Sequence, residues 1–306
     1  MRVETIADCR CEIAEVPMWH PTHERVYWID IPAGEMYWYD PETDAYEQCF
    51  DGGVMGGYSI QEDGSFLLFM EAGAIRRLDP AAFEDGIADD SDLETVVDSL
   101  PGEADSRFND VIADPKGRVF GGTMPTDDQL GALYRLETDG SVTTVIEDID
   151  LPNGMGFSPD REVIYVTESN THTIHAYDYD LETGDIDNQR VFVDVPEDEG
   201  MPDGLTVDEE GYVWSARWDG GCLVRYSPDG EEVARIHFPA RKVSSVTFGG
   251  ENYEQAYVTT ALGEPLAAGE SVADRREEEG AGAGALFRVE LGVSGVPEFR
   301  SRIGLA

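Results

Sequence analysis

A unit of two strands joined by a turn occurs six times along the chain, and this repetition constrains the fold more than any other feature. In each unit a small or polar residue precedes a strand, a turn containing Pro, Asp, Glu or Gly follows, and an aromatic or β-branched strand comes next. The units read VPMWHPTHERVYWID, GGYSIQEDGSFLLFM, NDVIADPKGRVFGGT, NGMGFSPDREVIYVT, DGLTVDEEGYVWSA and SVTFGGENYEQAYVTT. Their turns are roughly 42 to 52 residues apart, the spacing of propeller blades. The sequence therefore predicts an all-β fold, a six-bladed β-propeller.

The whole chain is expected to form one domain. It has 306 residues, and propellers of this length fold as single units. No stretch has helical periodicity of useful length, and residues 80–90 are expected to form a loop with at most one helical turn. Residues 263–284 are rich in Glu, Ala and Gly, which predicts a flexible acidic insertion in the last blade that takes no part in the chemistry.

Polar residues recur at one position of the repeat, about six residues before each turn. At this position the inner strand of a blade begins near the central axis. The six residues are Glu15, Gly57, Asn109, Asn153, Asp203 and Val246. Four of them carry a carboxylate or carboxamide, and the symmetry of a propeller brings them together as a set of hard oxygen ligands suited to Ca²⁺, Mg²⁺ or Mn²⁺. The alternative is that Asn153 and Asp203, each followed by Gly, are only turn residues.

The charge of the chain excludes several classes of partner. Asp and Glu number 64 against 21 Lys and Arg, which gives a formal net charge of −43, and Lys116 and Lys242 are the only lysines. Such a surface repels phosphate backbones and anionic lipids, so we expect no nucleic-acid or membrane partner. The first twelve residues contain charges and no apolar core of a signal peptide, which predicts a cytoplasmic protein. We expect a halophilic monomer or small homo-oligomer, adapted to a salt-filled cytosol.

Several motifs together resemble the gluconolactonase and regucalcin (senescence marker protein) family. They read AEVPMWHPTHERVYWIDI, RFNDVIADPKGRVFGGTM, LPNGMGFSPDREVIYVTES, TIHAYDYDLETGDI and PDGLTVDEEGYVWSARW, and the resemblance extends to about Ala261. It implies a six-bladed propeller that holds one divalent cation through a Glu, an Asn and an Asp. The matching motifs assign these roles to Glu15, Asn153 and Asp203.

The same resemblance implies residues that contact the substrate. Arg107 and Asn109 match the family's RxND stretch, whose Arg and Asn face the substrate, and Asp127 corresponds best to an acidic residue that contacts sugar hydroxyls. Two motifs depart from the family pattern. Val111 follows the RFND motif where the family usually has Gly, and the first motif reads AEVP rather than GEGP. Both departures leave the expected ligands in place and bear on substrate identity.

The function implied is the hydrolysis of a sugar lactone, such as a glucono-, xylono- or arabinolactone, to the aldonic acid, a reaction of carbohydrate metabolism. One bound divalent ion (Ca, Mg, Mn, Zn or Fe) polarises the ester carbonyl, so no protein nucleophile is needed. Asp203 is the expected general base and catalytic residue. Two alternatives remain: a metal-dependent hydrolase of the phosphotriesterase type on the same site, and a non-enzymatic calcium-binding or scaffold propeller.

The charge generates a prediction about salt. Mutual repulsion among the carboxylates opposes folding in dilute buffer and is screened within about 3 Å in molar salt. We expect the thermal midpoint of unfolding and the activity to rise steeply with KCl concentration. A midpoint that stays flat from dilute buffer to molar KCl would contradict adaptation to salt.

Overall fold

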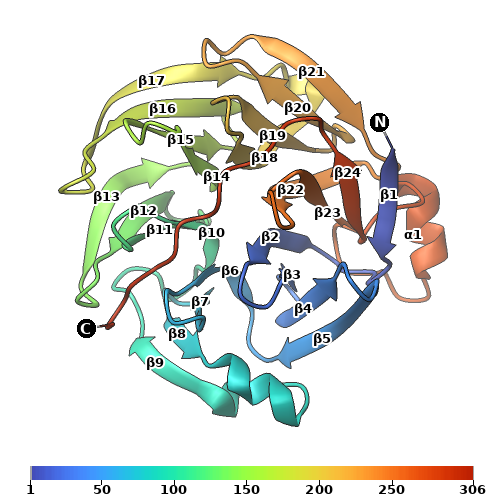
Figure 1. The fold of residues 1–306 in the computed structure, drawn as a ribbon, viewed down its shortest axis with the longest axis horizontal. Helices are drawn as coiled ribbons and strands as arrows, with labels where there is room; N and C mark the ends of the chain where they lie inside the picture. The colour runs from blue at the N-terminus through green and yellow to red at the C-terminus, as the bar shows by residue number, and fades with distance from the viewer. Residues whose placement is uncertain (1, 306) are drawn as a thin grey trace.

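The computed structural model describes residues 2–305, and its strands form six four-stranded antiparallel sheets arranged around one axis (Figure 1). The predicted six-bladed β-propeller is confirmed. Blade 1 contains β2 (Ala14–His20), β3 (Arg25–Asp30), β4 (Glu35–Asp40) and β5 (Ala45–Asp51). Blade 2 contains β6 (Met55–Ile60), β7 (Phe66–Met70), β8 (Ile75–Leu78) and β9 (Leu93–Val97). Blade 3 contains β10 (Phe108–Ala113), β11 (Val119–Thr123), β12 (Gly131–Leu136) and β13 (Val142–Ile149).

The second half of the chain repeats this pattern. Blade 4 contains β14 (Pro152–Phe157), β15 (Val163–Glu168), β16 (Thr173–Tyr179) and β17 (Ile186–Asp194). Blade 5 contains β18 (Met201–Val207), β19 (Val213–Trp218), β20 (Cys222–Tyr226) and β21 (Glu232–His237). Blade 6 contains β22 (Lys242–Gly249), β23 (Gln255–Ala261), β24 (Leu286–Glu290) and β1 (Val3–Ala7). The first strand of the chain therefore completes the last blade and closes the ring.

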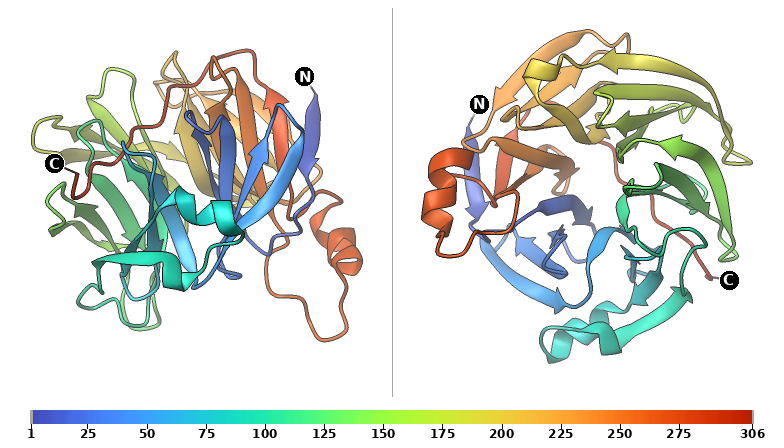
Figure 2. Two further views of the ribbon diagram at one scale, coloured as in Figure 1. Left: turned by 60° about the horizontal axis from the view of Figure 1, so that its bottom comes forward. Right: turned by 180° about the vertical axis from the view of Figure 1, so that it is seen from behind.

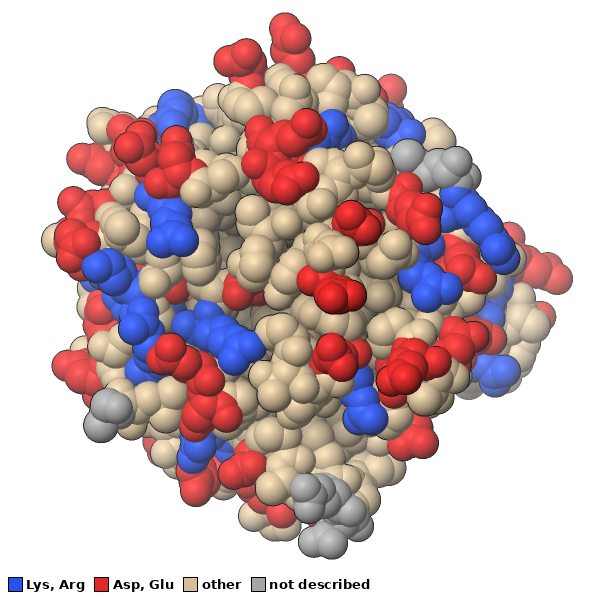
Figure 3. Space-filling view, in the orientation of Figure 1, with Lys and Arg blue, Asp and Glu red and all other residues tan. Residues whose placement is uncertain are grey.

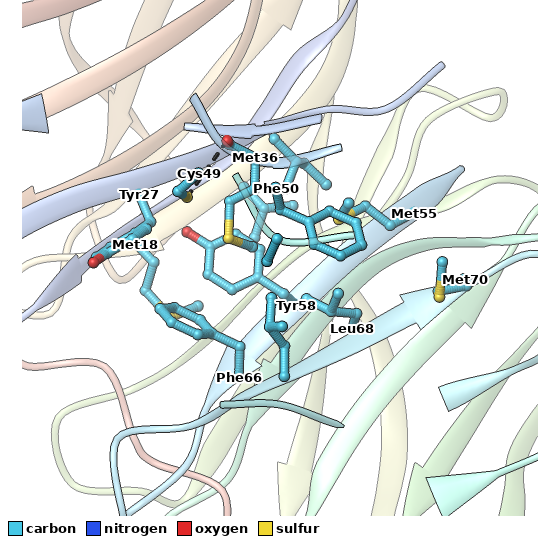
Figure 4. Packing of buried hydrophobic residues seen from close by; sticks show 14 of the residues in the cluster. Met18, Tyr27, Met36, Cys49, Phe50, Met55, Tyr58, Phe66, Leu68 and Met70 are labelled. Atoms are coloured by element: carbon cyan, nitrogen blue, oxygen red, sulfur yellow. Dashed lines mark hydrogen bonds between the residues drawn. The ribbon is translucent and has the colours of Figure 1, made fainter. Parts of the chain in front are cut away.

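Burial decreases from the axis to the rim of the ring. The six inner strands, β2, β6, β10, β14, β18 and β22, are buried along almost their whole length. The outer strands, such as β13 and β17, expose most of their side chains. Each of six apolar clusters fills the space between two neighbouring blades. Figure 4 shows the cluster between blades 1 and 2, to which Phe50 contributes from blade 1 and Tyr58 from blade 2. Packing between blades thus fixes the inner strands around the axis.

The two ends of the central channel differ. The C-terminal residues after β24 cross the face seen in Figure 1 and contact the ends of the inner strands. Gln61, just after β6, pairs with Ser301, and Asp208, just after β18, pairs with Gly295. On the same face, the Asp and Glu side chains are spread over all blades and interspersed with Lys and Arg (Figure 3). The beginnings of the inner strands lie at the opposite end, away from these contacts of the C-terminal segment.

Two segments contain more helix than the sequence predicted. Residues 263–284 contain an α-helix, α1 (Val272–Glu279), so the expectation of no helix there is wrong. Its first turn is stabilised by a capping box between Ser271 and Asp274. Two 3₁₀ helices, η1 (Pro80–Asp85) and η2 (Asp90–Asp92), precede β9, and η3 (Glu197–Glu199) precedes β18. Among residues 2–305, no helix is both long and apolar enough to cross a bilayer.

Glycines let neighbouring inner strands approach closely where these strands begin. Gly154 lies inside β14 and Gly204 inside β18, so Asn153 and Asp203 are strand residues and the alternative that they are only turn residues is wrong. A Cβ added to Gly154 would overlap the backbone of blade 5. It would lie only 2.5 Å from the carbonyl oxygen of Asp203. The residue after Asn153 must therefore lack a side chain for blades 4 and 5 to pack.

The close approach of the two backbones at Gly154 predicts that adding one methyl group there destabilises the protein. Gly154→Ala should lower the free energy of unfolding by about 1–3 kcal/mol, because rigid backbone must move to admit the Cβ. Chemical denaturation at constant salt measures the change. Gly53→Ala is the control, since its Cβ would come close only to the flexible end of the Met70 side chain (3.0 Å) and would lie at ordinary contact distance from the Asp90 carboxylate. Equal stabilities of the two variants would contradict the packing argument.

Candidate active site

A β-bulge lies near the beginning of every inner strand. The register of pairing with the next strand shifts at equivalent places in all six blades. A bulge leaves residues out of the ladder and redirects their side chains, and bulges are common beside active sites. Asn109, Asn153 and Asp203 lie within these shifts, and Glu15 directly precedes one. Four of the predicted polar residues therefore lie at or beside equivalent bulges, at the same end of the axis.

The bulges also correct two positions of the predicted ring. The residue of blade 2 that corresponds to Asn109 is Gly56, and that of blade 6 is Ser244, rather than Gly57 and Val246. Val246 is buried in the apolar cluster between blades 5 and 6. Counting back from the turn fails there because the strands and turns of the blades differ in length.

A cavity of about 310 Å³ lies at this end of the axis. Its polar wall consists of Glu15, Arg107, Asn109, Asn153, Ser169 and Asp203. Met124, Leu151 and Trp218 are among its apolar residues, and Glu264 lines it from the segment that contains α1. Asp127 is exposed and does not line this cavity, so its contact with substrate stays a prediction. The sequence reasoning did not identify Ser169, Trp218 or Glu264.

Hydrogen bonds fix the orientation of the two carboxamides. Asn109 Nδ2 donates to the carbonyl of Pro152 (3.0 Å), and Arg107 Nη1 donates to Asn109 Oδ1 (3.0 Å). Both ends of the Asn109 amide are therefore engaged within the protein. Asn153 Nδ2 donates to Ser169 Oγ (3.2 Å), which in turn donates to the carbonyl of Pro202 (2.7 Å). This bond uses the nitrogen of Asn153 and leaves its Oδ1 available as a ligand.

The carboxylates of the site are buried beside one another. Burial, followed by repulsion from Asp203 and Asp110, raises the pKa of Glu15 well above its usual value. Burial and repulsion from Asp110 likewise raise the pKa of Asp203, while the Asn153 amide opposes the rise. Burial raises the pKa of Asp110 to about 7 and lowers that of Arg107. A bound cation would offset the repulsion among these carboxylates and favour their ionised forms.

The backbone beside Glu15 is in a conformation that β-branched residues rarely adopt. Val16 has φ of 46°, in the left-handed region, and its N–H donates to Glu15 Oε2 (2.9 Å). Such a residue costs roughly 1–3 kcal/mol and persists only when its surroundings impose it. Val16 is one of the two positions, with Ala14, at which AEVP departs from the GEGP pattern. The strained turn therefore holds the Glu15 carboxylate toward the cavity even without the glycine.

The oxygen donors of the site suit a hard divalent cation. Glu15 and Asp203 supply two carboxylates and Asn153 supplies a neutral oxygen, a ligand set typical of Ca²⁺, Mg²⁺ or Mn²⁺. Within residues 2–305, no cluster of three or more His, Cys, Asp or Glu side chains is arranged to bind a metal ion. A metal site at the axis consequently requires an amide oxygen such as that of Asn153.

The sequence and the fold of this chain are similar to those of known proteins. Residues 13–262 match the model of the "SMP-30/Gluconolactonase/LRE-like region". The chain is 47% identical to pentonolactonase XacC of Haloferax volcanii over 305 residues, covering 100% of both chains, and 31% identical to regucalcin of Danio rerio, covering 98% of both. It superimposes on a luciferin-regenerating enzyme with a TM-score of 0.87, at 28% identity and 99% coverage of both chains. The chain belongs to the SMP-30/gluconolactonase/LRE-like family.

Proposed function

We propose that this protein hydrolyses a sugar lactone to the aldonic acid with the help of one divalent cation. The observation that carries the proposal is the convergence of Glu15, Asn153 and Asp203 on one cavity with Arg107 beside them. The similarity to a pentonolactonase over the full length favours a lactone of a five-carbon sugar acid. The cavity volume of about 310 Å³ suits a substrate of that size.

Glu15, Asn153 and Asp203 would hold the cation. When bound, a divalent cation polarises an ester carbonyl and stabilises the negative charge that develops on its oxygen. The remaining chemistry belongs to the side chains around it. The bulges and the hydrogen bond from Asn153 to Ser169 keep the ligand oxygens in place before substrate arrives, so little reorganisation is needed on binding.

In this proposal Asp203 acts as the general base. It accepts a proton from the attacking water as the water oxygen bonds to the lactone carbonyl carbon. The ring C–O bond then breaks, and the proton passes to the leaving hydroxyl oxygen. The Arg107 guanidinium, held by its bonds to the Phe108 carbonyl (2.8 Å) and Asn109, donates a hydrogen bond to the carbonyl or to a ring hydroxyl. No step requires a covalent intermediate with the protein.

Metal removal tests the proposal directly. Dialysis against a chelator in molar KCl should abolish hydrolysis of pentono- and hexonolactones, and adding back single divalent cations should restore it, because without the cation the ester carbonyl is not polarised. A pH-indicator assay of acid release measures the rates. Full activity after chelation would contradict metal dependence. Absence of lactone hydrolysis with every added cation would overturn the proposed function.

Two substitutions separate the role of base from that of ligand. Asp203→Asn keeps an oxygen and a similar shape but removes basicity, so kcat at saturating cation should fall by about 10²–10⁴-fold. Asn153→Ala removes a neutral ligand, so cation affinity should weaken and excess cation should restore part of the activity. Steady-state kinetics against cation concentration distinguishes the two. Near wild-type turnover of Asp203→Asn at saturating cation would assign the base elsewhere.

A further inference from the structure

The segment between β23 and β24, residues 262–285, here called the strap, reaches the candidate active site. Figure 2 shows it projecting from the ring on the side away from the C-terminal segment, with α1 at its outer end. Gly263 N–H donates to the carbonyl of Glu12 (2.9 Å), and Leu262 N–H donates to that of Cys11 (3.3 Å). The strap is thus attached to the residues that precede β2, the strand of Glu15.

Arg275 of α1 holds the beginning of the strap. Its Nη1 donates to the carbonyls of Leu262 (3.3 Å) and Glu264 (2.5 Å), and its Nη2 donates to that of Pro265 (3.4 Å). Two further bonds join the guanidinium to Glu270 (2.7 and 2.9 Å). The planar fork of arginine makes this multiple contact possible, and a lysine could not reproduce it. The backbone of Glu264 is therefore held in place by α1.

Lys242 fixes the other end of α1. Its Nζ donates to Glu279 (2.7 Å) and to Asp219 (2.9 Å), which follows β19. The ammonium group also lies 5.6 Å from the ring of Trp218, a residue of the cavity wall. These ion pairs are largely buried on the lysine side and are less exposed to screening than surface pairs. The strap is anchored at both ends of the helix.

Glu264 lines the mouth of the cavity and is exposed to solvent. Its carboxylate has no hydrogen-bond or ion-pair partner in the part of the chain that the structure describes. The other acidic residues of the cavity, Glu15 and Asp203, are engaged by the proposed cation, and both ends of the Asn109 amide are occupied. Glu264 is consequently a free acceptor for donors on a bound molecule.

We infer that Glu264 is a specificity-determining residue that accepts hydrogen bonds from hydroxyl groups of the substrate, and that Arg275 is the positioning residue that holds it. The inference rests on the proposed function and names the part of the substrate that is recognised. A carboxylate accepts from two neighbouring hydroxyls at once, which matches a polyhydroxylated lactone. A lactone without hydroxyls gains nothing from this contact.

The experiment compares substrates in the full-length protein loaded with cation. Glu264→Gln should raise KM for a pentonolactone about tenfold with kcat nearly unchanged, because hydrogen bonds to a charged acceptor are the stronger ones. KM for unsubstituted γ-butyrolactone should stay the same. Glu277→Gln is the matched control, since Glu277 is exposed on α1 of the same strap and does not line the cavity. An unchanged KM for the pentonolactone, or an equal rise for both substrates, would overturn the inference.

A binding measurement separates this inference from the proposed function. Calorimetric titration with xylitol, which has the hydroxyls but no ester, should show about tenfold weaker affinity for Glu264→Gln than for wild type. This difference decides the inference even if no lactone is hydrolysed, whereas only the failure of hydrolysis overturns the proposed function. Equal xylitol affinities, or no xylitol binding by wild type, would count against Glu264.

A double-mutant cycle tests Arg275. If Arg275 acts through Glu264, Arg275→Ala should raise KM for the pentonolactone by a similar factor, and the double variant should be no worse than either single variant. Arg275→Lys should fail to restore KM, because it cannot bond to several carbonyls at once. Additive effects of Arg275→Ala and Glu264→Gln would show that Arg275 does not position Glu264.

Discussion

The close approach of the inner strands at the axis is the constraint on which the site depends. Where β14 meets β18 and β18 meets β22, glycines allow one backbone to lie against the next, and Gly154 and Gly204 each follow a proposed ligand. At the axis, the closely packed inner strands leave room for only a few side chains. The surrounding blades shield these side chains from water. Two carboxylates in such a space repel each other and lose hydration, which raises their pKa. The same packing that builds the ring therefore creates a place where a cation would offset this repulsion.

Much of the fold could be predicted from the sequence because each blade buries its inner strands in the same way. The six units coincide with the first two strands of the six blades, and four of the predicted ring residues line one cavity. The ring positions in blades 2 and 6 were missed because a bulge moves the inward-facing residue, and neither Gly56 nor Ser244 has a chemical signature. The roles of the residues in the cavity remain predictions.

The strap could not be predicted from hydrophobic patterning. No residue of α1 is buried, so periodicity gives no signal, and the helix is instead stabilised by its capping box and by ion pairs from Arg275 and Lys242. The spacing of Ser271 and Asp274 was the one local signal that could have indicated the start of the helix. Arginines replace lysines in such contacts throughout the chain; Arg225, for example, bonds to both Asp208 and Glu210. The planar fork of a guanidinium allows such a residue to join several acceptors at once.

The pairing of β1 with β24 affects how the protein folds during its synthesis. Val3 pairs with Val289, so the partners that close the ring lie 286 positions apart in the sequence. On the ribosome, β1 emerges first and must wait for almost the entire chain before its partner exists. Until then blade 1 has no neighbour on one side, and after release β24 presents an unpaired edge until β1 docks. A ribosome that stops early thus releases an open arc with an exposed apolar flank, which is a target for chaperones and proteases.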